Sequence, residues 1–145
     1  METRIVKYMF GYRLISGLKS VKYNNYIKDM EKFKKLFADV IHKLKISFIE
    51  ITYAMLIYIH HYRLLRINAG RKTITYYNAL CVSLMLSNKL LNDRPYKNMA
   101  WSTYLNRPLK VINMIELKFL LEVNFEVIPP YTQFRKIWFE LFSEV

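Results

Sequence analysis

The amino-acid sequence predicts an all-α domain, and three observations support this fold class. Only three Gly and four Pro occur in 145 residues, whereas a β-sandwich or β-barrel needs a turn after every short strand. Apolar residues recur at helical spacing in several long stretches. One stretch is apolar around its whole circumference, which is typical of a helix enclosed by other helices. The chain length suits a single domain with its own core.

The first core helix is expected to begin at Asp29. Its apolar residues form one stripe at helical spacing: Met30, Phe33, Phe37, Val40, Ile41 and Leu44. Residues 1–27 are basic and interrupted by Gly, so they are predicted to be an N-terminal extension in which residues 5–18 could form a short flanking helix. The domain itself is expected to span residues 28–145.

The second and third helices are expected at the centre of the domain. Ser47 is a candidate N-cap, and Glu50 follows it at capping-box spacing, for a helix that continues to about residue 66. The third helix begins at Thr73 or Thr75 and ends near residue 92. Its middle, residues 79–86, contains the stretch that is apolar all round, so this helix is predicted to be the central, buried one.

Three more helices complete the prediction. A short fourth helix covers about residues 95–104, and Pro108 at a first helical position opens a fifth that runs to about residue 124. Pro129 and Pro130 prevent the fifth helix from continuing, and residues 131–142 are expected to form a flanking C-terminal helix. The expected architecture is therefore five core helices packed round the third, with helical segments at both ends.

The composition also indicates the compartment. Cys81 is the single cysteine, so no intrachain disulfide can form and a reducing compartment, the nucleus or the cytoplasm, is expected. Residues 1–20 lack the pattern of a secretory signal. The longest uncharged run, Thr73–Asn88, is shorter than the roughly 20 apolar residues that cross a bilayer, so no membrane association is expected.

Positive charge is concentrated toward the N-terminus. The net charge is +12, and residues 1–45 hold 11 Lys and Arg against four acidic residues. Such an excess indicates either an acidic partner, such as nucleic acid, membrane phosphate or an acidic protein face, or a solvated basic face with no partner. Neither interpretation identifies a partner.

Residues for catalysis or for metal binding are not found at the required spacing. The three His are His42, His60 and His61, and none of them belongs to an HxxxH, ExxH or CxxC pattern. His60 and His61 are predicted to lie at a helix surface or boundary, and Cys81 in the core. The sequence therefore predicts no catalytic residue, no metal site, no cofactor and no enzymatic activity.

Two charged residues stand beside apolar stripes. Lys89 follows the apolar run of the third helix, and Glu116 lies within the stripe of the fifth. Each could reach solvent from a boundary position, or the two could pair with each other.

In sequence, much of the chain, from about Lys34 to Trp138, resembles a cyclin box and is most similar to the single-box Pho-type and plant P/U-type cyclins. Four stretches in the family's order carry this resemblance: Ile51–Ile59, Asn78–Asp93, Tyr96–Trp101 and Val111–Phe125.

The resemblance implies a regulatory subunit of a cyclin-dependent kinase, a cell-cycle or related regulator, with a Pho-type partner kinase. Lys89 matches the family's lysine and Glu116 its glutamate, and both are expected to hydrogen-bond to the start of the kinase C helix. Phe125 and Val127 match the apolar pair that packs against that helix. Phe125 itself could be this exposed anchor or a plug of the core.

The chain also departs from the family pattern. Asn92 replaces the first acid of the usual pair, Arg94-Pro95 follows it, and the first helix carries no substrate-docking patch. The alternative of another class is a nucleic-acid-associated protein of the cyclin fold, which the +12 charge favours. A third possibility is a basic peripheral membrane protein that uses residues 1–27, although Gly11 and Gly17 interrupt any amphipathic helix there.

Overall fold

The computed structural model describes residues 35, 38–67, 74–128 and 130–142. Throughout this part of the chain the regular structure is helical, with no strand. Residues 38–44 are helical, and five complete helices follow: α4 (Phe48–Ile67), α5 (Tyr76–Leu91), α6 (Asn98–Leu105), α7 (Leu109–Glu122) and α8 (Tyr131–Phe142). The all-α prediction is thus confirmed. The extension 1–27 and the first turns of the helix expected from Asp29 lie outside the described residues.

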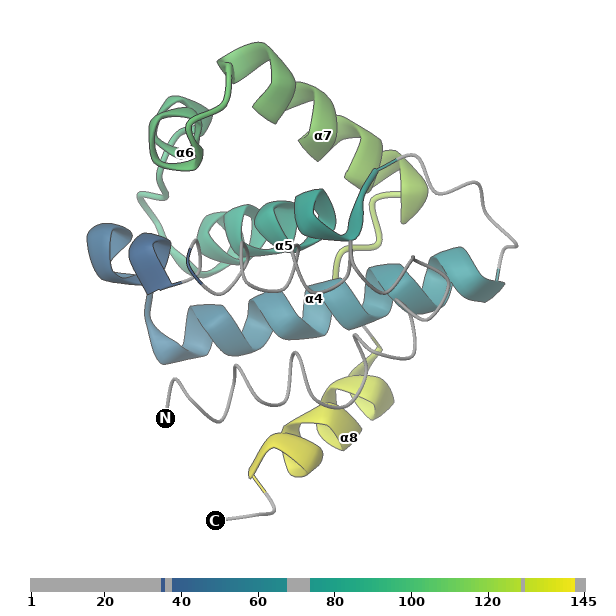
Figure 1. The fold of residues 1–145 in the computed structure, drawn as a ribbon. Helices are drawn as coiled ribbons and strands as arrows, with labels where there is room; N and C mark the ends of the chain where they lie inside the picture. The colour runs from purple at the N-terminus through teal and green to yellow at the C-terminus, as the bar shows by residue number, and fades with distance from the viewer. Residues whose placement is uncertain (1–34, 36–37, 68–73, 129, 143–145) are drawn as a thin grey trace.

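Helix α5 is the centre of the domain, as predicted. Its residues 79–88 are all buried, which agrees with their apolar character on every side of the helix. Figure 1 shows α4 alongside α5, with α7 crossing above them, and α5 packs directly on both helices. Helix α8 lies on the other side of α4, where the rings of Phe134 and Tyr53 are 5.5 Å apart.

The helix starts follow the predicted local chemistry. The Ser47 hydroxyl accepts a hydrogen bond from the Glu50 amide at 3.2 Å, and the Thr75 hydroxyl caps α5 through the Asn78 amide, also at 3.2 Å. Pro108 is the N-cap of α7 and not its first helical residue, so this prediction was wrong by one position. Helix α8 has the predicted bounds.

The fourth helix begins later than predicted. It starts at Asn98 and not at residue 95, because the side chain of Asn88 accepts a hydrogen bond from the Tyr96 amide at 2.9 Å and holds residues 92–97 outside the helix. The Tyr96 hydroxyl donates to the carbonyl of Leu44 at 2.8 Å, which ties this loop to the end of the first helix.

The capping-box prediction for Glu50 is correct for its backbone amide, which Ser47 caps, but does not describe the contacts of its side chain. The side chain of Glu50 is buried, with 8% of the residue exposed, and its two carboxylate oxygens accept hydrogen bonds from the amides of Asn88 and Asn92, each at 3.2 Å. The Glu50 carbonyl also accepts from the Ser87 hydroxyl at 2.5 Å. Glu50 therefore joins α4 to the C-terminal end of α5, because a buried carboxylate requires hydrogen-bond donors around it.

His60 and His61 are both buried, so their prediction as surface or boundary residues was wrong. The reason lies in the tertiary structure. Other parts of the chain cover most sides of α4, so the two different helix faces on which His60 and His61 lie are both enclosed. The His61 Nε2 lies 2.5 Å from the Glu122 carboxylate of α7, and its ring stacks on Phe119 at 4.2 Å. In the described residues, no helix is both long enough and apolar enough to cross a membrane.

Candidate functional site

Lys89 lies in the last turn of α5, where the helix leaves the core. A basic residue is favoured there because the carbonyl end of a helix carries partial negative charge. The preceding residues are buried and the following ones are exposed, so the lysine stem crosses the boundary between core and solvent. Its ammonium is consequently directed toward the neighbouring helix α7.

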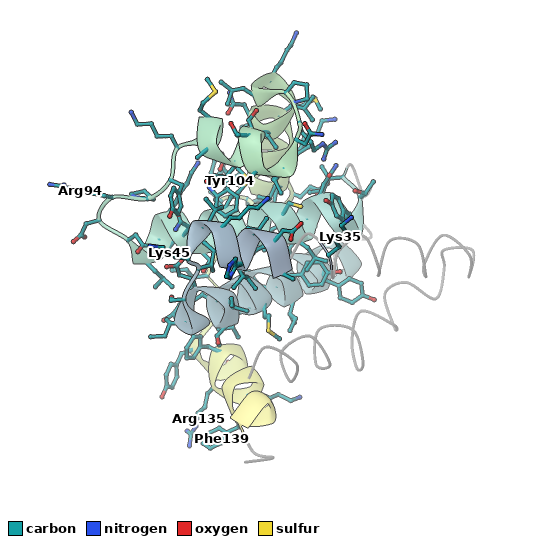
Figure 2. All side chains as sticks on the ribbon, turned by 60° about the vertical axis from the view of Figure 1, so that its left-hand side comes forward. Lys35, Lys45, Arg94, Tyr104, Arg135 and Phe139 are labelled. Atoms are coloured by element: carbon teal, nitrogen blue, oxygen red, sulfur yellow. The ribbon has the colours of Figure 1, made fainter. Side chains whose placement is uncertain are left out.

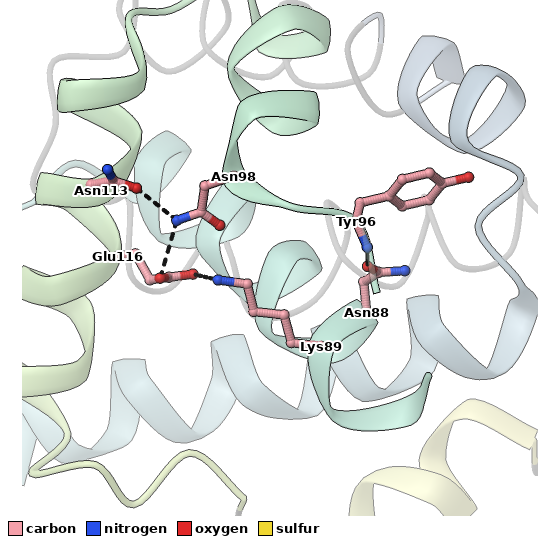
Figure 3. A network of polar contacts seen from close by, with 6 residues as sticks. All are labelled: Asn88, Lys89, Tyr96, Asn98, Asn113 and Glu116. Atoms are coloured by element: carbon pink, nitrogen blue, oxygen red, sulfur yellow. Dashed lines mark hydrogen bonds and ion pairs between the residues drawn. The ribbon is translucent and has the colours of Figure 1, made fainter. Parts of the chain in front are cut away.

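Glu116 lies in the middle of α7 and meets Lys89 directly (Figure 3). The Lys89 Nζ is 2.6 Å from the Glu116 Oε2, and 31% and 16% of the two side chains are exposed. The sequence predicted both as site residues, and the structure joins them into one pair although 27 positions separate them. The pairing is one of the two possibilities that the sequence left open.

Two asparagines that the sequence analysis did not select complete the cluster. The side-chain amide of Asn98, at the start of α6, donates to the side-chain oxygen Oδ1 of Asn113 at 2.8 Å and to the Glu116 Oε1 at 3.3 Å. The signal for Asn113 was its position three residues before Glu116, which puts both side chains on one helix face. We call Lys89, Glu116, Asn98 and Asn113 the polar cluster.

The polar cluster keeps unused hydrogen-bonding capacity. Lys89 has three N–H donors, and in the described part of the chain its ammonium makes one hydrogen bond. Glu116 accepts one bond on each oxygen, whereas a carboxylate offers about four lone-pair positions. A partner can therefore bind to the pair without breaking the contacts that hold it in place.

Phe125 is exposed, so it is not a plug of the core. The residue is 61% exposed and has a φ of 60°, and Asn124 before it has a φ of 51°. The hydrogen bonds from Phe125 N to Leu120 O (2.8 Å) and from Asn124 N to Leu121 O (3.2 Å) form a Schellman motif at the end of α7. Asn tolerates the left-handed region, but a bulky aromatic residue there is costly.

Val127 lies between core and solvent. It is partly buried and packs against the core cluster, whereas Phe125 extends into solvent. The four site residues of the sequence analysis thus form two parts. Lys89 of α5 pairs with Glu116 in the middle of α7, and Phe125 and Val127 lie just after the end of α7.

Of the positions at which the chain departs from the cyclin-box pattern, Asn92 has a local structural role. Asn92 is the C-cap of α5, and its amide donates both to Glu50 and to the Asn88 carbonyl, the latter at 2.9 Å. An acid at position 92 would place a second carboxylate beside that of Glu50. Arg94 is exposed and points away from the body of the molecule (Figure 2).

The described residues contain no cluster of metal-binding groups, and their single cysteine is buried. Cys81 is buried as predicted, and this burial raises the pKa of its thiol to about 12, so no thiolate forms near neutral pH. The half-buried Tyr77 hydroxyl also has a raised pKa, mainly because of its burial. Over the described ranges, no group of three or more His, Cys, Asp and Glu could hold a metal ion.

Comparisons with known proteins do not extend this description: no protein-family model, no curated protein and no solved structure matches the chain.

Proposed function

We propose that this protein is a cyclin-like regulatory subunit that binds a cyclin-dependent kinase on its C helix and activates it. The proposal starts from the resemblance of four ordered stretches to a cyclin box. The observation that carries it is the pairing of Lys89 with Glu116 on the outside of two adjacent helices, with α7 leading from that pair to an exposed Phe125.

The polar cluster suits recognition of a helix end. Lys89 can donate to a carboxylate or carbonyl of the partner, and Glu116 can accept from backbone N–H groups at a helix N-terminus, which favours negative charge. Asn98 holds Glu116 in position before binding, so little side-chain entropy remains to be lost. The geometry of the pair is therefore compatible with the role that the resemblance implies.

Phe125 supplies the apolar part of the same surface. A large aromatic side chain that is exposed on a left-handed residue costs stability in the isolated protein, and such residues often occur at functional sites. Covering this ring in an interface recovers apolar burial that the free chain lacks. The ring is therefore our apolar anchor for the kinase C helix.

Activation follows from preferential binding to one kinase conformation. A kinase is active when the glutamate of its C helix pairs with the lysine that holds the ATP phosphates. A partner that binds only this conformation shifts the population toward it, and a shift from 1:99 to 99:1 requires a preference of about 5.5 kcal/mol. No cofactor is required in this scheme.

The test is binding of the purified protein to a panel of purified cyclin-dependent kinases, followed by kinase assays. The substitutions Lys89→Ala, Glu116→Ala and Phe125→Ala are each expected to weaken binding by about 2 kcal/mol or more, because charge-assisted bonds and aromatic anchors dominate such interfaces. Each is expected to lower the free energy of unfolding by clearly less than this amount, because none of the three residues is fully buried.

Matched control variants separate the site from general surface effects. Lys43→Ala and Asp39→Ala change exposed charges on the helix at 38–44 and are expected to leave kinase binding unchanged. If Lys89→Ala or Glu116→Ala unfolds the protein while the remaining folded fraction still binds, the pair is structural and the assignment is wrong. If no kinase of the panel binds, the proposed function fails.

The second candidate is a nucleic-acid-associated protein of the same fold, and the net charge of +12 favours it. The Lys89–Glu116 pair has no role in that function, since a lysine already bound to a carboxylate contributes little to phosphate binding. Tight, sequence-dependent binding of duplex DNA at physiological salt would favour this candidate over the kinase regulator.

A further inference from the structure

Helix α7 is apolar on two opposite sides. Ile112, Ile115 and Phe119 are buried and pack into the core. Met114, Leu117 and Leu121 recur at i, i+3 and i+7 as well, but they are 46%, 53% and 56% exposed. We call these three residues the outer stripe.

The outer stripe lies almost diametrically opposite the buried one. At about 100° per residue, the centre of the outer stripe is roughly 160° away from the centre of the buried stripe. Glu116 lies between them, about 130° from the outer stripe on the same count. The outer stripe is therefore a surface separate from the polar cluster, and the site proposed above does not account for it.

The charges around the outer stripe are positive. Lys110 and Lys118 are exposed on the same side of α7. The two acidic residues of the helix, Glu116 and Glu122, are engaged elsewhere, by Lys89 and by His61. On the same count, Lys118 borders the outer stripe and Lys110 continues it one turn toward the N-terminus of α7. An apolar strip with basic residues on one side and at one end, and with no carboxylate of its own, complements an apolar strip flanked by acidic residues.

We propose that the outer stripe is a docking surface for an acidic amphipathic helix of a partner protein. The leucines and the methionine would bind its apolar face, Lys118 would pair with a carboxylate beside that face, and Lys110 with one at its end. A second copy of this chain does not fit, because a symmetric contact would bring the same lysines of two chains of net charge +12 together. This inference does not depend on the kinase-regulator proposal.

Two synthetic helical peptides of about 18 residues test the proposal with the full chain; this length is enough for partial helix formation. One carries leucines along one face with glutamates on the borders, and its twin has lysines in place of the glutamates. We expect the acidic peptide to bind with a Kd in the micromolar range and the basic twin to bind at least about tenfold more weakly. In ¹⁵N NMR spectra, the amide shifts should change mainly over residues 110–121.

The matched variants use exposed residues, so the fold should remain intact. Leu117→Gln combined with Leu121→Gln should weaken binding of the acidic peptide at least about tenfold, since both side chains would be interface anchors. Ile49→Gln, an equally exposed aliphatic residue on α4, should leave it unchanged.

Four results would overturn the proposal. The two peptides could bind the chain equally well, or the double variant could bind the acidic peptide as well as the original chain does. The original chain could sediment as a dimer and the double variant as a monomer, or the double variant could lose kinase binding. The last result would assign the stripe to the kinase interface. Kinase binding that survives in the double variant, together with lost peptide binding, would support two separate surfaces.

Discussion

Replacing Phe125 by Gly should affect kinase binding far more than folding. Phe125 is 61% exposed, so it buries little more than a third of its surface. With about 150–250 Å² for a fully buried aromatic side chain and about 25 cal/mol per Å², the lost burial amounts to about 1.5–2.5 kcal/mol. Glycine at a φ of 60° removes a backbone strain of about 1 kcal/mol or more.

The two terms largely cancel, so the free energy of unfolding should fall by only about 1 kcal/mol or less. For a chain of this length that corresponds to a change in melting temperature of about 4 °C or less. The comparison variant is Phe119→Ala on the same helix. Phe119 is 0% exposed, and its truncation should cost about 3–5 kcal/mol.

The assay is urea denaturation of the three isolated proteins, followed by binding to the kinase. We expect Phe125→Gly to lower the free energy of unfolding by about 1 kcal/mol or less but to weaken kinase binding by about 2–4 kcal/mol. A loss of stability similar to that of Phe119→Ala would show that the Phe125 ring is needed by the fold. Phe125 would then leave the list of binding residues.

Three other outcomes are expected. Glu50→Ala removes the buried acceptor of two asparagine amides and should cost about 2–4 kcal/mol in urea denaturation, whereas a neutral effect would mean that solvent replaces the carboxylate. Burial raises the pKa of the Cys81 thiol from 9.0 to about 12, so the unfolded chain loses this proton first and the stability should fall as the pH rises from about 9 toward 12. The contribution of this thiol should reach about 1 kcal/mol at pH 10, so Cys81→Ala should lose less stability between pH 8 and pH 10 than the original chain. The same loss in both proteins over this pH range would contradict the prediction. Binding of duplex DNA should be weak, independent of sequence and steeply reduced by salt, as expected of unspecific contacts by a basic chain.

Most of the fold could be predicted because helix formation depends on local pattern. The stripe of the first helix is buried where it is described, at Val40, Ile41 and Leu44. Ser47 and Thr75 cap the helices that they were expected to cap, since an N-cap hydroxyl needs only the amide three residues later. The apolar surroundings of Cys81 likewise predicted its burial in the central helix.

The candidate site depended on contacts between helices. The sequence selected Lys89 and Glu116 but left open whether they meet, and it did not select Asn98. The burial of His61 was missed because its partner, Glu122, comes 61 residues later and the pair forms only when α7 crosses α4. Helical spacing describes one element at a time, so it cannot tell which polar side chains of different elements will meet.

Over the described residues, the sequence by itself determined the order and approximate bounds of the helices, most of the apolar residues that face the core and the residue types present for a polar site. The tertiary structure decided that Glu50 is buried among amides, that Lys89 meets Glu116 and that Phe125 remains in solvent. The physical reason is that caps and stripes depend on neighbours within about four residues, whereas burial and pairing depend on which distant helices pack together.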